Sequence, residues 1–230
     1  AFTVGINLTS DEKYFIITSS DHNTSEQYYF SSNENFPKPK LIKKRKKGII
    51  YSVNSWDKNF YMHTNEDAED FKIDYSKDLT EEKWKPYIPP QEEVLIGGLT
   101  FLNQWVIRSE ISNALAKIYV KDILTEKEEE IIFTDEKVIE PGISIVQKDR
   151  DTDLIYLSYS SPKTQSRTYI YNLETKKRNL VKEQEIPSGH NPNDYIVERL
   201  ECNSHDERKI PITIIRNKKT KIDGNAKVLL

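Results

Sequence analysis

The sequence predicts an all-β protein built from a repeating unit of about 45 residues. Apolar residues alternate with polar ones or form short runs, and no stripe with helical spacing is present. Four strands rich in β-branched and aromatic residues recur regularly: their centres, Ile16, Tyr61, Val106 and Tyr156, lie 45, 45 and 50 residues apart. A repeat of this length with several strands per unit is typical of propeller blades, which bury their faces against one another. A β-sandwich with evenly spaced hairpins is the alternative that the spacing leaves open.

Each predicted unit contains a pair of strands, and charged outer segments follow at 41–44 and 178–181. The first strands of the pairs are 14–17, 60–62, 105–107 and 154–157, and their partners are 27–30, 71–73, 117–120 and 168–171. After the fourth unit, the polar segment 183–193 contains Pro187, Gly189 and Pro192, which is typical of a linker. Two further strands, 195–200 and 210–215, flank a polar turn. We therefore expect blades in residues 1–190 and the start of a second domain in residues 191–230.

The composition narrows the class of protein. Charged residues make up 31% of the 230 residues but nearly cancel to a net charge of −3, which argues against a dedicated nucleic-acid binder. No run of about 18 apolar residues is present, so no membrane-spanning helix is expected. Cys202 is the only cysteine, and a lone buried thiol without a signal peptide favours the cytoplasm. The start without methionine and the apolar end, 227–230, lead us to expect a truncated chain.

The sequence supplies no recognisable catalytic centre. A serine nucleophile on a strand-to-helix elbow needs a Gly-x-Ser-x-Gly pattern, which none of the seven glycines forms. The four histidines are scattered and are interpreted as surface or turn residues: His22, His63, His190 and His205. None has metal-site spacing, and Cys202 with His205 is only half of such a site. We therefore predict no catalytic residue, no metal and no cofactor in this chain, and no substrate-binding residue can be named.

Charged clusters are interpreted as surface features. The strongest, Lys43–Lys47, follows an outer strand and precedes the next one, which favours a turn over a nucleic-acid patch. The acidic groups 92–93 and 128–130 could serve acid–base chemistry, but a loop or an outer strand is favoured. Charges at the edges of sheets block edge-to-edge pairing.

Four sets of segments follow one another along the chain: Thr24–Glu26, 61–65 leading to 70–73, Trp84 with 88–90, and 159–161 with 169–171. In this order they resemble the propeller of oligopeptidase B, a serine peptidase of the prolyl oligopeptidase family. The stretch 195–199, Asp206 and 210–213 resembles the family's entry into its catalytic domain. Departures at Asp70-Phe71, Thr164-Gln165 and Asp206-Glu207 indicate a divergent member.

This resemblance implies a seven-bladed propeller that covers an α/β-hydrolase domain and filters peptides by size, with cleavage after Arg or Lys in relatives. The chain would hold about four blades, the last of the seven, and the first antiparallel hairpin of the hydrolase domain. The catalytic Ser, Asp and His would follow Leu230, so the chain alone is expected to be inactive. Its expected partners are peptide substrates and the missing α/β-hydrolase domain. We also expect the four blades to form an open arc and not a closed ring, and chains to self-associate through the uncovered blade faces. A free-standing propeller-like interaction module is the alternative.

Overall fold

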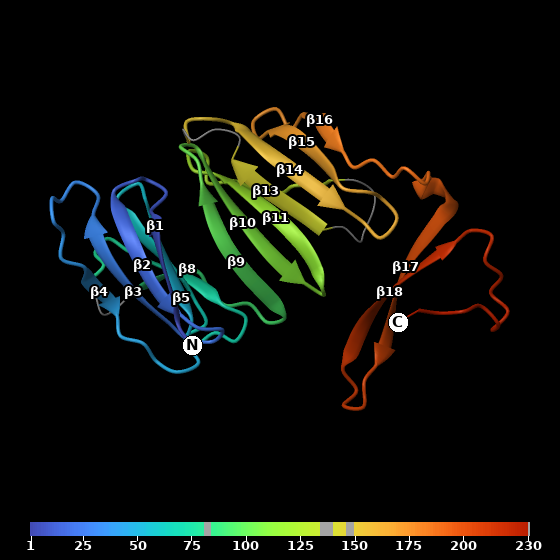
Figure 1. Cartoon of the computed structure of the whole chain (residues 1–230), viewed down its shortest axis with the longest axis horizontal. Coiled ribbons are helices and arrows are strands. Elements are labelled where there is room, and N and C mark those ends of the chain that lie inside the picture. The colour runs from blue at the N-terminus through green and yellow to red at the C-terminus, as the bar shows by residue number, and fades with distance from the viewer. Residues whose placement is uncertain (81–83, 134–139, 146–149, 230) are drawn as a thin grey trace. The chain divides into compact units, whose positions relative to one another are not determined.

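The computed structural model describes all residues except 81–83, 134–139, 146–149 and 230. Among the described residues, every regular element is a β-strand apart from one short 3₁₀ turn, η1 (Pro192–Asp194). The strands form four separate four-stranded antiparallel sheets and one two-stranded hairpin (Figure 1). The prediction of an all-β chain with repeated units is confirmed, and the alternative of two face-packed sheets is not found.

Each of the four sheets consists of four strands that are consecutive in the chain. Sheet 1 contains β1 (Thr3–Leu8), β2 (Tyr14–Ser20), β3 (Ser25–Ser31) and β4 (Lys40–Lys43). Sheet 2 contains β5 (Tyr51–Trp56), β6 (Asn59–Thr64), β7 (Lys72–Ser76) and β8 (Lys85–Ile88). Sheet 3 contains β9 (Val94–Phe101), β10 (Trp105–Ser112), β11 (Leu115–Asp122) and β12 (Glu128–Glu130). Sheet 4 contains β13 (Glu140–Ile145), β14 (Leu154–Ser160), β15 (Arg167–Asn172) and β16 (Arg178–Glu183).

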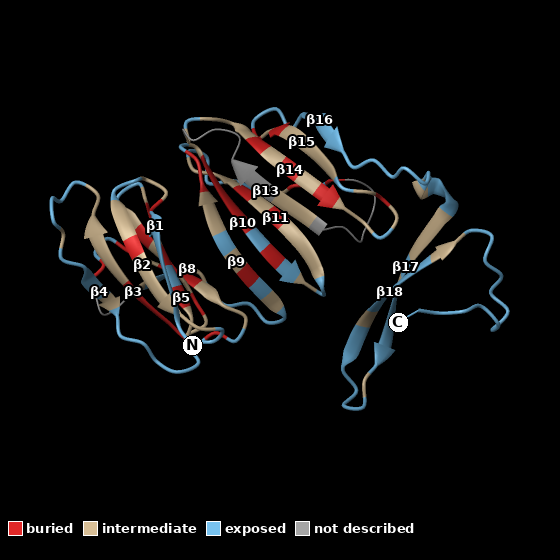
Figure 2. Cartoon of the chain, viewed as in Figure 1, coloured by how far each residue is buried: buried red, intermediate tan, exposed pale blue. Residues whose placement is uncertain are grey.

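The last two strands, β17 (Tyr195–Asn203) and β18 (Lys209–Asn217), pair along their whole length. This hairpin confirms the two strands predicted after the polar linker. Most of its residues are exposed (Figure 2). The chain divides into two compact units, one of residues 1–112 and 119–128 and the other of residues 113–118 and 129–230. The domain boundary near residue 190 stays a prediction.

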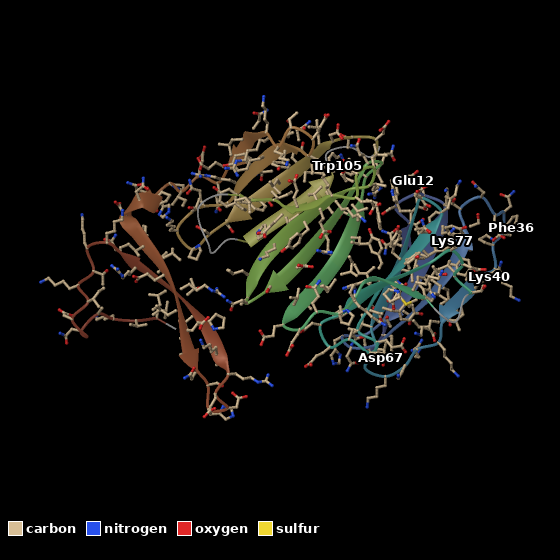
Figure 3. The ribbon with its side chains drawn as sticks, turned by 180° about the vertical axis from the view of Figure 1, so that it is seen from behind. Glu12, Phe36, Lys40, Asp67, Lys77 and Trp105 are labelled. Carbon is tan, nitrogen blue, oxygen red and sulfur yellow. The ribbon has the colours of Figure 1, made fainter. Side chains whose placement is uncertain are left out.

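Several tight turns use left-handed backbone in residues other than glycine. Asp57 and Lys58 connect β5 to β6 with φ of 46° and 61°, and Asn113 and Ala114 connect β10 to β11 with φ of 49° and 53°. Two successive left-handed residues match the right-handed twist of a hairpin. The longer connection before β4 contains Phe36, which is fully exposed (Figure 3).

The core of the first unit forms where sheet 2 packs on sheet 1. Buried side chains of sheet 2 and of its β7–β8 connection form one cluster: Tyr51, Val53, Phe60, Met62 and Leu79. Partly buried side chains pack against this cluster: Tyr14, Tyr29, Ile42 and Trp84. We call the face of a sheet that packs toward the next sheet its forward face, and the opposite face its rear face. The rear face of sheet 2 therefore packs on the forward face of sheet 1.

Candidate functional site

The free edge of β5 is capped by polar side chains of sheet 1. The Tyr51 amide donates to Ser25 Oγ at 2.7 Å, and the same hydroxyl donates to the Tyr51 carbonyl at 2.8 Å. Two residues along, the Val53 amide donates to Gln27 Oε1 at 2.8 Å. An uncovered strand edge would otherwise leave buried backbone groups without partners, which costs free energy. Ser25 and Gln27 thus join two neighbouring sheets through hydrogen bonds.

The Tyr51 side chain completes this joint. Its hydroxyl accepts a hydrogen bond from the Gln27 amide at 2.8 Å and donates one to the Lys43 carbonyl at 2.5 Å. Both groups lie where the β3–β4 pairing shifts register after Gln27, so the phenol satisfies backbone groups that the shifted pairing leaves free. Burial raises the pKa of Tyr51 to about 12, so the hydroxyl keeps its proton near neutral pH.

A second joint of the same kind links sheets 2 and 3. The Ile96 amide of β9 donates to the Asp70 carbonyl at 2.9 Å, and His63 Nε2 lies 2.7 Å from the Ile96 carbonyl. The His63 ring also stacks on Phe71, with centroids 4.5 Å apart. Burial lowers the pKa of His63, which favours the neutral ring. The interpretation of His63 as a surface or turn residue is wrong, because β6 places its ring half-buried between two sheets.

The same stack accounts for a small error in the predicted strands. Residues 71–73 were expected to be extended, but β7 begins at Lys72 because Phe71 adopts a left-handed conformation with φ of 66°. That conformation is uncommon for an aromatic residue. It places the Phe71 ring on His63 at the joint between the two sheets.

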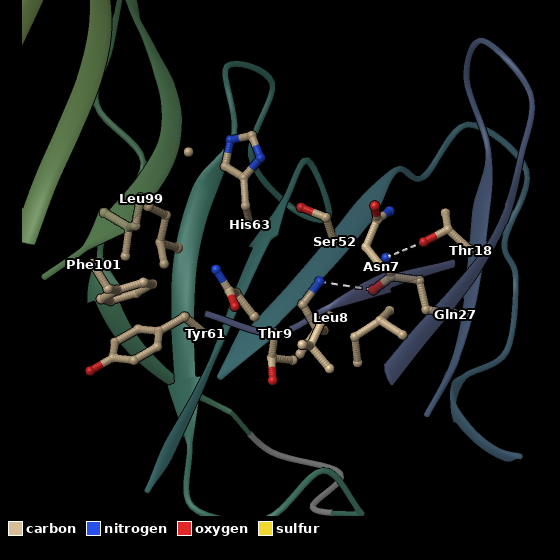
Figure 4. A pocket seen from close by; sticks show the side chains of 15 residues that line it. Asn7, Leu8, Thr9, Thr18, Gln27, Ser52, Tyr61, His63, Leu99 and Phe101 are labelled. Atoms are coloured by element: carbon tan, nitrogen blue, oxygen red, sulfur yellow. Dashed lines mark hydrogen bonds between the residues drawn. The ribbon is translucent and has the colours of Figure 1, made fainter. Parts of the chain in front are cut away.

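A cavity of about 350 Å³ lies among sheets 1, 2 and 3 within the first unit (Figure 4). Fifteen residues line it: Asn7, Leu8, Thr9, Ile16, Thr18, Gln27, Ser52, Val53, Asn54, Tyr61, His63, Ile73, Gly98, Leu99 and Phe101. None has a charged side chain at neutral pH, although 31% of the chain is charged. Among the described residues, no side-chain hydrogen bond is formed by Asn7 or Ser52. Both can therefore bind an uncharged polar ligand.

The basic run Lys43–Lys47 lies at the end of β4 and in the connection to β5, as predicted. Acidic side chains of β3 and of the connection after β6 pair with it. Arg45 lies 3.0 Å from Glu26, and both Lys43 and Lys46 form ion pairs with Glu66. The guanidinium and amide of Arg45 hold the pKa of Glu26 at about 2. The run thus helps to fix the connection between sheets 1 and 2, and its lack of a nucleic-acid role stays a prediction.

The acidic groups also lie where the pattern indicated. Glu128–Glu130 is the outer strand β12, and its members pair with three different bases: Arg108, Lys176 and Lys117. Glu92 and Glu93 are exposed just before β9.

The remaining histidines and the cysteine form no site. His22 and His205 are exposed, whereas His190 lies 2.7 Å from the Lys163 carbonyl and stacks on Tyr195. The described parts of the chain contain no group of three His, Cys, Asp or Glu side chains that could hold a metal ion. Cys202 is exposed on β17, so the expectation of a buried thiol is wrong: the hairpin leaves it uncovered. Within the described ranges, no helix has the length and apolar character needed to cross a bilayer.

Comparisons with known proteins agree with this architecture. Residues 1–184 match the model of the prolyl oligopeptidase N-terminal beta-propeller domain. The chain is 27% identical to dipeptidyl aminopeptidase BI of Pseudoxanthomonas mexicana, over all of this chain and 32% of that protein. It is 22% identical to protease 2 of Moraxella lacunata, over all of this chain and 33% of that protein. The chain therefore spans about a third of the length of these relatives.

Solved structures show the same fold. Oligopeptidase B from Trypanosoma brucei, in a closed form with covalently bound antipain, matches with a TM-score of 0.84 and 22% identity, over 96% of this chain and 33% of that one. Oligopeptidase B from Leishmania major matches with a TM-score of 0.81 and 18% identity over the same shares. Together with the family match over residues 1–184, the four consecutive four-stranded sheets show that this chain belongs to the prolyl oligopeptidase N-terminal β-propeller family.

Proposed function

We propose that this chain is the propeller portion of a serine peptidase of the oligopeptidase B type, and that the propeller governs which peptides reach the peptidase domain. The family match over residues 1–184 is the observation that carries this proposal. The 230 residues contain no Gly-x-Ser-x-Gly pattern, so a nucleophilic serine would be supplied by a separate α/β-hydrolase domain. By the same resemblance, that enzyme cleaves short peptides after Arg or Lys. The single cysteine of the chain, Cys202, supports a cytoplasmic location.

The uncharged cavity supports a role in admitting peptides. Propeller sheets surround a central channel, and the cavity includes residues from the first strands of three consecutive sheets: Asn7 on β1, Ser52 on β5 and Gly98 on β9. A lining without charge neither attracts nor repels charged peptide side chains strongly. Asn7 and Ser52 can bind peptide amides whatever the neighbouring side chains are. Such a surface suits a filter that selects by size and leaves the choice of residue to the peptidase domain.

The β17–β18 hairpin supports the presence of a further domain in the whole protein. One of its faces carries apolar side chains that are 37–52% exposed, Leu200, Ile210, Ile212 and Ile214. An exposed apolar face of this kind marks a surface that another element covers. We propose that residues 191–230 begin the α/β-hydrolase domain and that this face packs on the rest of it.

An assay of the 230-residue chain tests whether the peptidase chemistry lies in a separate domain. A fluorophosphonate probe should label no serine, and esters of Arg or Lys should not be hydrolysed above background. Labelling of one serine at unit stoichiometry would overturn the proposal.

A chimera tests the filter. The matching part of dipeptidyl aminopeptidase BI is replaced by this chain, with the native relative as control. The chimera should hydrolyse short peptides and leave folded proteins intact. A folded chimera that degrades folded proteins as fast as it hydrolyses short peptides would contradict the filter role.

A free-standing interaction module built from the four sheets is the second candidate function. The DNA downstream of this sequence separates the two functions: a continuing frame that encodes Gly-x-Ser-x-Gly followed by Asp and His favours the peptidase, and its absence favours the module.

A further inference from the structure

One backbone carbonyl in the cavity wall is free to accept a hydrogen bond from a ligand. On β5, the Val53 amide donates to Gln27 Oε1 at 2.8 Å and not to the neighbouring strand β6. The amide and carbonyl of one residue point to the same side of a strand, so the Val53 carbonyl also points away from β6. No group that the structure describes donates to this carbonyl, and Val53 lines the cavity.

The same edge of β5 cannot pair with a whole additional strand, because its other groups are occupied. The Tyr51 amide donates to Ser25 Oγ, and that hydroxyl donates to the Tyr51 carbonyl. Further along, the Ser55 carbonyl accepts from the Asp11 amide at 3.2 Å. A peptide that adds to a sheet as a new strand needs alternating donors and acceptors along the edge. The Val53 carbonyl alone permits a weak contact and no extended ladder.

Two side chains that are free to bind flank this edge (Figure 4). Asn7 lies on the forward face of sheet 1, because it pairs with Ile16, and Ile16 pairs with Tyr29, which packs against the core of sheet 2. Ser52 points to the forward face of sheet 2, because its neighbours in β5 are buried on the rear face. Neither side chain bonds to a residue that the structure describes. The cavity thus crosses the edge of β5 with one hydrogen-bonding side chain on each side.

His63 adds a second acceptor on the Ser52 side of the edge. The two residues pair across β5 and β6, and both line the cavity. His63 Nε2 lies 2.7 Å from the Ile96 carbonyl, and a carbonyl only accepts, so Nε2 carries the proton. The neutral ring, which burial favours by lowering the pKa of His63, therefore presents Nδ1 as an acceptor. The free groups of the cavity are mainly acceptors, and they match ligands that supply N–H donors.

We propose that the cavity binds the main chain of an extended peptide, with a peptide N–H donating to the Val53 carbonyl and with Asn7 and Ser52 bonding to the flanking peptide groups. This inference rests on the proposed admission of peptides by the propeller, and it names the group that is recognised. Main-chain N–H groups occur in every peptide apart from its prolines. The lining carries no charge that would favour an ionised ligand. Recognition is therefore independent of peptide side chains, and the single edge contact allows each peptide to leave again.

Titration of the isotope-labelled 230-residue chain with short peptides, followed by the amide NMR shifts of the protein, tests this. The probe is an uncharged peptide of alanine and serine with blocked ends, and it should shift the resonances of cavity residues. A matched depsipeptide has an ester oxygen in place of each internal N–H, so it keeps the shape and loses the donors. It should bind about tenfold more weakly. Exchange of serine for glutamine in the probe should leave its affinity unchanged.

Variants of the chain test the flanking groups. Asn7→Leu and Ser52→Ala each remove a hydrogen-bonding side chain at an exposed position and should weaken binding of the probe about threefold to tenfold. Asn35→Leu is the matched control, because it makes the same change at an exposed asparagine of the β3–β4 connection, outside the cavity. Its affinity for the probe should equal that of the unaltered chain.

Equal affinity of the peptide and the depsipeptide would overturn the proposal, as would absence of binding or shifts confined to residues outside the cavity. An equal loss of affinity in Asn35→Leu and Asn7→Leu would also overturn it. The depsipeptide leaves the protein unaltered, so its result stands even if Asn7→Leu does not fold. Serine labelling and size selection by the chimera do not require this contact, so failure here leaves the proposed peptidase role in place. A labelled serine would overturn that role and leave peptide binding in the cavity unaffected.

Discussion

Removing one oxygen atom from the joint between sheets 1 and 2 should weaken the fold measurably. Tyr51→Phe preserves the shape of the side chain but deletes the hydroxyl that accepts from the Gln27 amide and donates to the Lys43 carbonyl. Tyr51 is 2% exposed, so water cannot easily replace the lost partner. An orphaned buried amide costs about 1–3 kcal/mol, and the second lost hydrogen bond adds about 1 kcal/mol. We therefore expect the free energy of unfolding to fall by about 2–4 kcal/mol.

Equilibrium unfolding in urea, followed by tryptophan fluorescence, measures this change. Trp84 packs against the same core cluster and reports on this region. A loss of this size should lower the urea midpoint by about 1 M. Tyr75→Phe is the matched control: Tyr75 is a half-buried tyrosine of sheet 2 whose hydroxyl makes no hydrogen bond to any residue that the structure describes, so the change should stay within about 0.5 kcal/mol. Equal stability of the two variants would refute the view that the Tyr51 hydroxyl closes the joint.

Three further predictions concern other contacts of the first unit. Gly97→Ala places a Cβ 2.7 Å from the Ser109 carbonyl oxygen, so it should lower the free energy of unfolding by about 1–3 kcal/mol, whereas the Cβ of Gly98→Ala meets nothing within 4 Å and should leave it unchanged. Thermal unfolding compares the two variants, and equal melting temperatures would contradict this prediction. Because the pKa of His63 is lowered in the fold, the unfolded chain binds a proton more readily, and the free energy of unfolding should fall as pH drops below about 6.5. His63→Gln should reduce this pH dependence in urea titrations, and an unchanged pH dependence would exclude a contribution of His63. The pKa of Glu26 falls from 4.5 to about 2 in the fold, so this residue contributes stability above pH 4.5 that is lost as pH falls toward 2. Glu26→Gln should therefore lower the free energy of unfolding by about 1–2 kcal/mol at pH 7 and by far less at pH 2, and an equal loss at both pH values would disprove the ion-pair contribution.

The sequence predicts the strands well because alternation of apolar and polar residues is a local signal. The middle strands of all four sheets and both strands of the hairpin lie where the pattern placed them. The joints could not be predicted in the same way, because they connect residues that are far apart in the chain. Ser25 and Tyr51 are 26 residues apart, and His63 bonds to the carbonyl of a residue 33 positions later.

The errors have the same origin. His63 is followed by the polar residues Thr64 and Asn65, and only the neighbouring sheet determines that its ring is half-buried. Cys202 lies in an alternating strand, which indicates burial only if something covers the apolar face of the hairpin. The cavity combines residues from seven strands of three sheets, so no single stretch of sequence carries its signature.

Each sheet takes its four strands from one uninterrupted stretch of chain, and this arrangement has a consequence for inheritance. A cut in the gene between two such stretches would separate neighbouring sheets without removing a strand from either, so duplication or loss of a whole sheet would leave every remaining backbone ladder complete. What such an event would disturb is the set of hydrogen bonds at the joint between two sheets, such as those of Tyr51 with Ser25 and Gln27, which point mutations can readjust. Lineages that carry this architecture can therefore change the number of their sheets more readily than proteins whose strands are shared between distant segments.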